Sequence, residues 1–460
     1  MMKRGASSKM KVAKFGGTSL ASAEQINKVL KIVTSDPDRK IIVVSAPGKR
    51  FAADIKVTDL LIKYGEALLT GSNIAEAQHA VIDRFQEIAK DLMLPYAKVE
   101  QLVKQLETAL NAVNPADDDF IELVKSFGED YSAQLVALYF QQQGVNANYV
   151  SPREAGLLLT NDAGYVQILP ETMDNLSHLA EREGIIIFPG FFGHSTSSKI
   201  ITFTRGGSDI TGSILAAAVN ADVYENFTDV DSVFVVNPNI VENPLPIEEL
   251  TFKEMRELSY SGFNVFSDEA LIPAFRARIP VNIRNTNNPE APGTRIVLER
   301  DDSINPVIGI ASDSGFCSIF VSKYMMNKEI GFGRKLLRIL EDEQISYEHT
   351  PSGIDNLSVI LRENQLNPAK EQRIKERIIN ELKVDDFAIR RNLSLIMIVG
   401  EGMRHTIGLA AKATKAFATA RVNIEMINQG SSEVSMMFGI KEVDEKKAIR
   451  ALYNEFFVIN

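Results

Sequence analysis

A lysine and two glycines stand near the start of the chain, where a short strand is predicted to end. Residues 10–15 are predicted to form a short strand, Lys14 lies within it, and Gly16 and Gly17 follow directly. Glycine lets the backbone turn sharply and lets a ligand approach main-chain N–H groups, where a Cβ would collide. Apolar residues in 26–33 recur at helical spacing, so a helix would direct its positive end towards the turn. The pattern predicts a phosphate-binding turn, with a plain tight turn as the alternative.

Three further polar turns follow predicted strands. Ser45 ends the β-branched run 40–45, residues 205–209 (RGGSD) precede a helix predicted over 210–219, and residues 228–229 (TD) follow a strand predicted over 221–227. Alternating strands and helices predict an α/β fold with a mainly parallel sheet between helices. Ligands gather at the carboxyl ends of such strands, so we expect these turns to lie together.

Composition excludes several classes of function. The net charge is −10 and no basic stripe offsets it, which argues against nucleic-acid and membrane-surface partners. No apolar run approaches the roughly 18 residues of a membrane span. A single cysteine, Cys317, excludes internal disulfides and fits a reducing, cytoplasmic setting. Five histidines and one cysteine leave little material for a zinc site, and we predict no protein metal site.

The 460 residues divide into a leader, a large α/β stretch and a duplicated tail. Residues 1–9 lack an apolar signal core and are expected to be a flexible leader. Residues 10–300 carry the strand and helix alternation, with a helical region over 58–143 that breaks near Gly71 and residues 114–115. Residues 301–306 are polar and are predicted to be the linker.

The tail contains a weak internal repeat. Residues 330–360 align without gaps with residues 407–437. Each copy is predicted to read helix, strand, strand, with a further strand before each helix, at 316–322 and 393–399. We therefore expect two small α+β modules, over 307–385 and 386–460, although the last segment could instead complete the first module. Two unrelated amphipathic helices are the alternative reading.

Together these motifs resemble those of the aspartate kinases. Residues 14–20 (KFGGTSL) are similar to the family's opening motif, residues 203–212 (FTRGGSDITG) to its central motif, and Thr228-Asp229 to its nucleotide-site motif. The tail resembles a pair of ferredoxin-like ACT domains, the family's amino-acid-sensing modules. The resemblance covers residues 10–460 and implies an amino-acid-kinase fold for the first unit.

The activity implied by the resemblance is transfer of the ATP γ-phosphoryl group to the side-chain carboxylate of L-aspartate, with Mg²⁺ bridging the phosphates. The product, 4-phospho-L-aspartate, opens the route to lysine, threonine and methionine. An ionised carboxylate needs no general base, so positioning and positive charge dominate. The resemblance makes Lys14 and Asp209 catalytic. It assigns substrate binding to Ser45, Thr58, Glu129, Arg205, Gly206, Gly207 and Ser208.

Within the substrate set, Arg205 is expected to hold the α-carboxylate through two parallel hydrogen bonds, and Glu129 the α-amino group. Asp209 would orient Lys14, but could also be an ordinary N-cap. Thr58 could likewise be only the N-cap of a helix starting at Asp59.

The nucleotide site implied by the resemblance departs from the family at two positions. Its residues are Lys14, Gly16, Gly17, Thr18, Thr228, Asp229, Phe234, Asn239 and Asn264. Many family members carry arginine where Asn239 stands and lysine where Asn264 stands. These replacements remove two cations, so the grip on ATP is expected to be weaker.

For the ACT-like tail, the resemblance implies an amino-acid effector and at least a homodimer. The candidate pocket comprises Met325, Gly331, Phe332, Glu348, Ser352, Gly353 and Asp355. The carboxylates of Glu348 and Asp355 would match a cationic side chain, so lysine is the first expected inhibitor and threonine the second. Both acids could also be solvated turn residues.

Two other functions stay open at this stage. The chain could be another amino-acid-kinase relative, acting on glutamate, acetylglutamate, carbamate or a nucleoside monophosphate, although those relatives lack tandem ACT modules. It could also be a catalytically silent amino-acid sensor. No stretch is left for a fused homoserine dehydrogenase.

Overall fold

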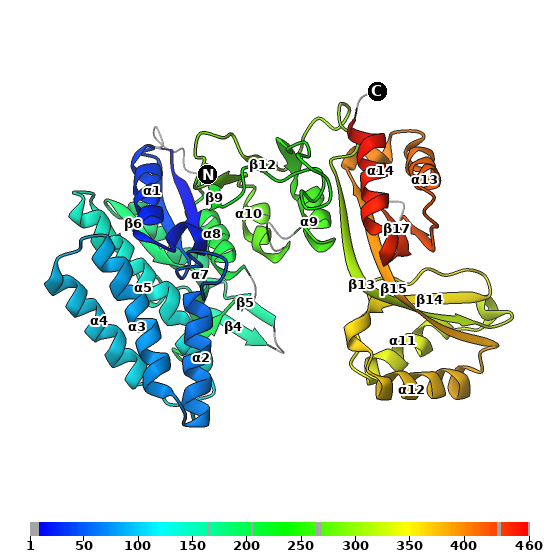
Figure 1. Cartoon of the computed structure of the whole chain (residues 1–460), viewed down its shortest axis with the longest axis horizontal. Coiled ribbons are helices and arrows are strands. Elements are labelled where there is room, and N and C mark those ends of the chain that lie inside the picture. Colours follow the sequence, from blue (N-terminus) through cyan, green and yellow to red (C-terminus); the bar gives the residue numbers. More distant parts are fainter. Residues whose placement is uncertain are drawn as a thin grey trace. The chain divides into compact units, whose positions relative to one another are not determined.

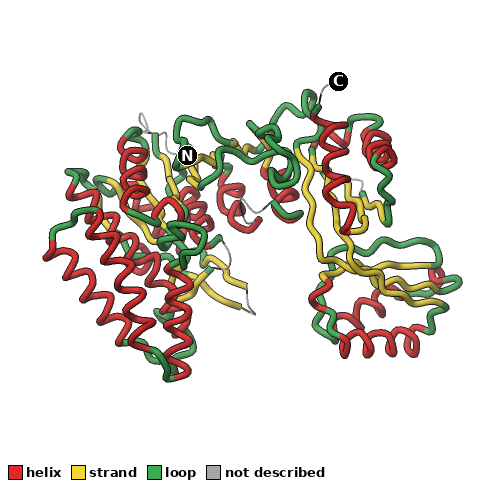
Figure 2. The backbone as a smooth tube through the Cα atoms, viewed as in Figure 1, coloured by secondary structure: helices red, strands yellow, loops and turns green. Residues whose placement is uncertain are grey.

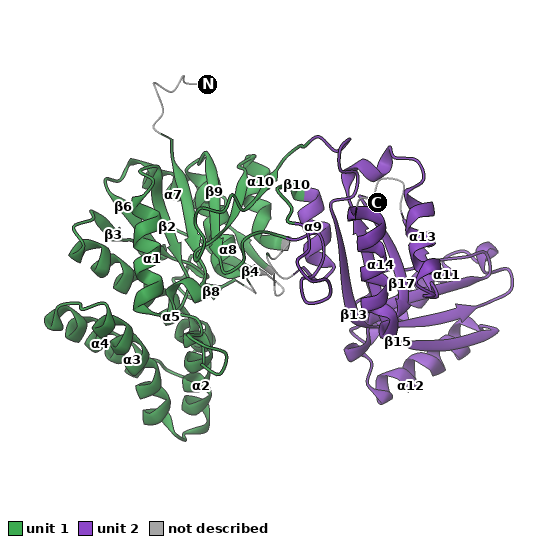
Figure 3. Cartoon of the chain, turned by 45° about the horizontal axis from the view of Figure 1, so that its top comes forward, with its two compact units in different colours: residues 1–233, 246–252, 265–300 green, residues 234–245, 253–264, 301–460 purple. Residues whose placement is uncertain are grey.

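The computed structural model describes residues 9–162, 165–203, 206–263, 266, 268–429 and 434–458. The chain divides into two compact units (Figure 3). Unit 1 comprises residues 1–233, 246–252 and 265–300, and unit 2 comprises 234–245, 253–264 and 301–460. The change at residue 301 falls where the sequence predicts a linker. The segments 234–245 and 253–264 differ from that prediction, since both were expected in the first unit.

Unit 1 is built on an eight-stranded sheet, mainly parallel, as predicted (Figures 1 and 2). Across the sheet the order is β10 (Glu249–Thr251), β12 (Thr294–Val297), β11 (Val281–Asn285), β9 (Val223–Thr228), β1 (Lys11–Phe15), β2 (Arg39–Val44), β6 (Ile185–Pro189) and β3 (Ala147–Tyr149). The pair β11–β12 is antiparallel. Strand β1 lies between β9 and β2, with Lys14 beside Asn226 on one side and Val43 on the other.

Both faces of the central strands are covered. Side chains alternate along β1, so Ala13 and Phe15 enter a buried cluster with helices of one layer. The residue between them, Lys14, points to the other face, where its ammonium meets helix α8 (Gly207–Ala218). The alternation of side chains along β1 therefore places Lys14 on the face of the sheet that helix α8 covers.

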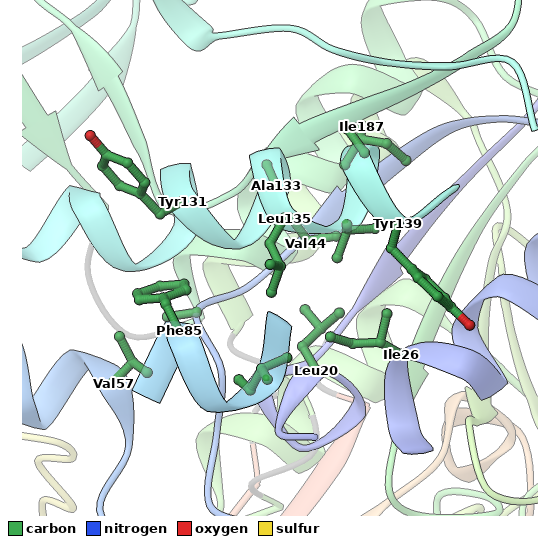
Figure 4. Packing of buried hydrophobic residues seen from close by; sticks show 14 of the residues in the cluster. Leu20, Ile26, Val44, Val57, Phe85, Tyr131, Ala133, Leu135, Tyr139 and Ile187 are labelled. Carbon is green, nitrogen blue, oxygen red and sulfur yellow. The ribbon is translucent and has the colours of Figure 1, made fainter. Parts of the chain in front are cut away.

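The first layer consists of five helices, of which the last four follow one another along the chain while β2 lies between the first two. They are α1 (Ala23–Thr34), α2 (Val57–Thr70), α3 (Ile74–Asp91), α4 (Tyr96–Asn111) and α5 (Phe120–Gln142). The sequence predicted the breaks near Gly71 and residues 114–115 but missed the one at 92–95. Leu20, Val57 and Phe85 belong to the cluster that joins this layer to the sheet (Figure 4).

Four strands of unit 1 lie outside the main sheet. Strand β4 (Leu159–Asp162) pairs with β5 (Tyr165–Ile168), and β7 (Phe192–His194) pairs with β8 (Ile200–Thr202). Both pairs are antiparallel. Other helical segments of this unit are η1 (Gly17–Leu20), α6 (Pro152–Ala155), α7 (Glu171–Ser177), η2 (His178–Glu181), η3 (Asp268–Leu271) and α10 (Ile272–Ala277).

Unit 2 contains one antiparallel sheet of five strands. Its order is β14 (Asn356–Arg362), β13 (Gly309–Ser322), β15 (Asp386–Val399), β17 (Ser435–Lys441) and β16 (Met426–Asn428). Its helical segments are η4 (Met326–Lys328), α11 (Phe332–Asp342), η5 (Glu363–Gln365), α12 (Pro368–Arg377), η6 (Ile378–Leu382), η7 (Glu401–Arg404), α13 (Leu409–Thr419), η8 (Glu442–Asp444) and α14 (Glu445–Phe457). Helix α9 (Phe252–Tyr260) also lies in this unit from Lys253 onward.

The predicted duplication is present in the structure. Strands β13 and β15, and helices α11 and α13, begin and end 77 residues apart. The two long strands pair along their length, from Gly309 with Val399 to Ser322 with Asp386. At their centre, Gly315 (φ 82°) and Asn392 (φ 55°) adopt the same left-handed conformation in equivalent positions. The register is interrupted there, so each strand divides into two halves.

The two modules therefore exchange strand halves. The core around α11 and α12 takes Cys317, Ile319 and Val321 from the second half of β13, with Phe387 and Ile389 from the first half of β15. The first half of β13 pairs instead with the second half of β15, and helix α14 packs against α13. The last segment thus completes the second module rather than the first. A single boundary between residues 385 and 386 does not describe this arrangement.

None of the helices in the described part of the chain combines the length and apolar character needed to cross a membrane.

Candidate active site

A buried ion pair occupies the predicted phosphate-site region. Lys14 Nζ lies 2.6 Å from Asp209 Oδ1, and the exposed fractions of the two side chains are 9% and 14%. Asn226 Nδ2, from the neighbouring strand β9, donates to the same Asp209 oxygen at 2.6 Å. Asp209 is thus held between a cation and an amide, and Lys14 has its direction fixed.

Helix α8 positions Asp209. Gly206, in a left-handed conformation, is the N-cap, so Asp209 is the third residue of the helix. The expectation that Asp209 is an N-cap is wrong. An acid in the first turn is stabilised by the helix dipole. Tyr224 also donates from its hydroxyl to the Asp209 carbonyl oxygen at 3.1 Å, which ties this turn to β9.

The Gly16-Gly17 turn is followed by the short 3-10 helix η1, not directly by α1. Helix α1 is capped separately by Ser22, so its N-terminus does not meet the turn as predicted. The N–H of Gly16 donates to Phe227 O at 3.1 Å, which removes it from ligand binding. Among the described residues, the N–H groups of Gly17 and Thr18 have no acceptor. These two groups and the Lys14 ammonium suit an anionic ligand.

Backbone contact joins this turn to the one after β2. Gly48 N–H donates to Gly17 O at 2.8 Å, and a Cβ on Gly17 would meet Ala46 O at 2.8 Å. Glycine is therefore required at residue 17 by the chain itself. Ser45, partly exposed, lies in this second turn, and its N–H donates to Phe15 O.

Glu129 lies within α5 and is buried. Burial raises the pKa of its carboxyl group to about 8, although backbone N–H groups of Ala46 and Glu129 itself oppose the shift. Its Oε2 has no hydrogen-bond partner among the described residues. The Ala46 contact links Glu129 to the turn of Ser45. A buried carboxylate oxygen without a partner is suited to receive a cationic group of a ligand.

The other predicted substrate residues of the described chain lie near the starts of helices α8 and α2. Ser208 packs against Gly190, directly after β6, where a Cβ would meet the serine hydroxyl at 2.5 Å. Gly207 is buried at the start of α8. Thr58 is the second residue of α2 and Lys56 is the N-cap, so the N-cap interpretation of Thr58 is wrong.

Thr228 ends β9, and its carbonyl accepts from the Thr286 N–H at 2.9 Å, while Asp229 is exposed. Phe234 and Asn239 fall in the 234–245 segment of unit 2. Arg205 and Asn264 lie outside the described residues.

Three contributing residues were missed by sequence reasoning. Asn226 and Tyr224 contact Asp209, and Arg84 contacts both turns of the site. Two of them left a signal in the sequence. Asn226 is a polar residue inside an otherwise buried strand, and Arg84 is a cation among the apolar positions of α3.

In unit 2 the structure divides the candidate effector residues between two sets of partners. Asp355 Oδ1 accepts from the Met325 N–H at 2.9 Å, and Met325 has a left-handed backbone. Glu348 instead pairs with Arg362 and accepts a hydrogen bond from the Tyr260 hydroxyl of α9. Neither acid is a fully solvated turn residue.

The glycines and the aromatic residue of this set sit at element ends. Gly331, with φ 77°, caps α11, and Phe332 is buried at its first position. Ser352 and Gly353 form a tight turn before β14, with Gly353 N–H donating to Asn356 O.

The arrangement in unit 1 suits transfer of a phosphoryl group. It offers a fixed cation, available N–H groups and a buried carboxyl group, but no described group of three His, Cys, Asp or Glu side chains that could hold a metal. Chemistry of this type depends on positioning and electrostatic stabilisation more than on covalent catalysis.

The comparisons with known proteins agree with a role in phosphoryl transfer. The model of the amino acid kinase family matches residues 9–285, and an ACT domain model matches residues 396–456. Aspartokinase 3 of Bacillus subtilis (strain 168) is 57% identical over 97% of this chain and 99% of its own. Clostridium acetobutylicum aspartate kinase superposes with a TM-score of 0.85 at 37% identity, over 97% of this chain and 100% of that one.

A further structure, E. coli aspartokinase III in complex with aspartate and ADP, has a TM-score of 0.77 at 23% identity, over 98% of this chain and 100% of that one. This likeness supports the fold. The parallel sheet, the Lys14–Asp209 pair and the match over residues 9–285 define the first unit as an amino acid kinase domain. By its identity to full-length relatives, the chain belongs to the aspartate kinases.

Proposed function

We propose that this chain transfers the γ-phosphoryl group of ATP to the side-chain carboxylate of L-aspartate, giving 4-phospho-L-aspartate and ADP. The observation that carries the proposal is the buried Lys14–Asp209–Asn226 constellation beside the turn of Gly17 and Thr18. The acceptor carboxylate is ionised near pH 7 and attacks without a general base.

In this mechanism Lys14 supplies positive charge to the moving phosphoryl group. Asp209 and Asn226 fix the ammonium before the substrates arrive, so no reorganisation is needed during transfer. The N–H groups of Gly17 and Thr18 bind a phosphate oxygen. These groups act on charge that develops in the transition state.

Glu129 and Arg205 recognise the amino-acid end of aspartate. The Glu129 carboxyl group is buried, and its unpartnered Oε2 favours pairing with the substrate α-ammonium. Arg205 would hold the α-carboxylate by two parallel hydrogen bonds. Ser45, Thr58 and the residues 206–208 complete the substrate site.

ATP fits the anion-binding groups present. Mg²⁺, when bound, would neutralise charge on the phosphates. Mg²⁺ usually keeps several waters and is held largely by substrate phosphates. Thr228, Asp229, Phe234, Asn239 and Asn264 are proposed to contact the nucleotide.

For unit 2 we propose that an amino acid, lysine first and threonine second, inhibits the kinase by binding near Met325 and Asp355. The chain is proposed to form at least a homodimer through its ACT modules. A cytoplasmic location is also proposed, since the one cysteine, Cys317, is a buried free thiol.

The test is a hydroxylamine assay, because hydroxylamine converts an acyl phosphate to a hydroxamate. Purified protein with ATP, Mg²⁺ and aspartate is expected to yield aspartyl hydroxamate. A protein that gives no product and yet binds lysine would instead be a silent sensor.

A further inference from the structure

Arg84 is a buried cation on the apolar side of helix α3. Its side chain is 3% exposed, and its neighbour Phe85 packs in the hydrophobic cluster with Val57 and Leu20 (Figure 4). A buried arginine is costly unless its donors are satisfied. Nη2 finds its acceptors outside α3, whereas Nε has no hydrogen-bond partner among the described residues.

Arg84 Nη2 donates to Ala21 O at 3.2 Å and to Gly48 O at 2.8 Å. Ala21 directly follows η1, which begins at Gly17 in the phosphate-binding turn. Gly48 belongs to the turn of Ser45, which we assign to the acceptor. One guanidinium nitrogen therefore joins the segment that follows the phosphate-binding turn to the turn of Ser45, and these two turns also meet through the Gly17–Gly48 backbone contact.

The guanidinium group of Arg84 also forms an ion pair. Arg84 Nη1 lies 2.9 Å from Asp54 Oδ2, in the loop between Gly48 and α2. Arg50 also binds Asp54, through two side-chain hydrogen bonds of 2.8 and 3.0 Å and one from its backbone N–H of 2.9 Å. Arg50 is far more exposed and contacts neither turn, so it provides a matched control on the same carboxylate.

We propose that Arg84 is a positioning residue for phosphoryl transfer, which sets the separation between the phosphate-binding turn and the acceptor-binding turn. The inference rests on the proposed function. Arg84 touches neither substrate, but the two turns that it joins carry the donor phosphate and the acceptor carboxylate. Misplacement of bound reactants by about 1 Å can cost a hundredfold in rate.

The experiment compares wild type with Arg84→Lys, Arg84→Gln and Arg50→Lys in full steady-state assays. Lysine keeps the charge but lacks the planar fork, so it cannot reproduce the contacts to Ala21, Gly48 and Asp54 together. We expect kcat to fall by about tenfold or more in both Arg84 variants, while KM for aspartate and ATP changes less than about threefold. Arg50→Lys is expected to keep kcat within about twofold.

A second readout separates positioning from stability. In Arg84→Gly, added guanidinium ion is expected to restore part of kcat, whereas methylammonium is not. Each rate is divided by the concentration of folded protein, which is taken from the folded fraction at the assay temperature in thermal melts.

A normalised kcat near the wild-type value in both Arg84→Lys and Arg84→Gln would overturn the inference. Failure of all the Arg84 variants to fold would also overturn it, because Arg84 would then serve stability alone. Wild type without hydroxamate product would refute the proposed function instead.

Discussion

Lys14 Nζ and Asp209 Oδ1 lie 2.6 Å apart, although one residue comes from the first strand and the other from the first turn of helix α8. The fold alone brings them together, because β1 alternation directs Lys14 to the face that α8 covers. Asn226, beside Lys14 in the parallel register, completes the set.

Removing this cation tests its role in transfer. Lys14→Ala is expected to lower kcat by about a hundredfold or more, the scale for loss of one preorganised electrostatic contact. KM for aspartate should change little. The control is Lys11→Ala, since Lys11 lies in the same strand but forms a partly exposed pair with Asp36. Similar kcat values in the two variants would remove Lys14 from the mechanism.

The raised pKa of Glu129 predicts a pH dependence of stability. Its pKa is about 8 in the folded protein against an ordinary value of 4.5, so between these values the folded state holds a proton that the unfolded state releases. This contribution to the free energy of unfolding is fully present below pH 4.5 and is lost as pH rises through 8. Glu129→Gln should remove it, with urea unfolding at pH 5, 7 and 9 as the measurement.

The same carboxyl group predicts a pH dependence of substrate binding. The α-ammonium of aspartate pairs with the ionised form, so KM for aspartate should fall as pH rises from 6 towards 8. Glu129→Gln should raise KM and flatten this profile. A variant whose urea series and KM profile both follow wild type would contradict the assignment.

Asn239 and Asn264 predict weak binding of ATP, because neither side chain carries a positive charge. Introducing Arg at Asn239 and Lys at Asn264 adds two cations, which should lower KM for ATP severalfold and increase its salt dependence. The matched control replaces both by Gln, which adds length without charge. An unchanged KM in the charged variant would mean that other residues already fill this role.

The hydrogen bond from Tyr260 to Glu348 connects α9 with the first ACT module inside unit 2. Asp355, rather than Glu348, lies against Met325, so the structure refines the expected effector site. Asp355→Asn should weaken inhibition by lysine by about tenfold, through loss of a charge-assisted contact.

Tyr260→Phe should leave lysine binding intact but reduce the resulting inhibition.

Activity and isothermal titration calorimetry with lysine and threonine, separately and together, measure both effects. Lysine that fails to bind wild type, alone or with threonine, would make the effector assignment wrong. Equal inhibition of wild type and Asp355→Asn would place the pocket elsewhere.

Local sequence patterns predicted much of the fold. The β-branched run 40–45 predicted β2, and the internal repeat predicted a helix in each copy, which the structure shows as α11 and α13. Patterns of this kind carry no information on pairing between distant segments. Sequence therefore missed the exchange of strand halves between the two modules, which depends on the left-handed residues Gly315 and Asn392.

The site was predicted only in part, because local patterns do not identify contacts between distant segments. Lys14 and Asp209 were named from motifs, and the structure brings them together. The Gly16 N–H was expected to bind phosphate, but Phe227 O from the adjacent strand takes it. Arg84 was missed because its role depends on carbonyl groups of two distant turns, which no local pattern identifies.

The most direct test of the aspartate kinase assignment is the rate of acyl hydroxamate formation with aspartate and with glutamate, measured with ATP, Mg²⁺ and hydroxylamine in wild type and Lys14→Ala. We predict steady product with aspartate, at least about tenfold less with glutamate because one extra methylene misplaces the acceptor, and near-background product in Lys14→Ala. Absence of aspartyl hydroxamate in wild type, or equal rates with glutamate, would contradict the account.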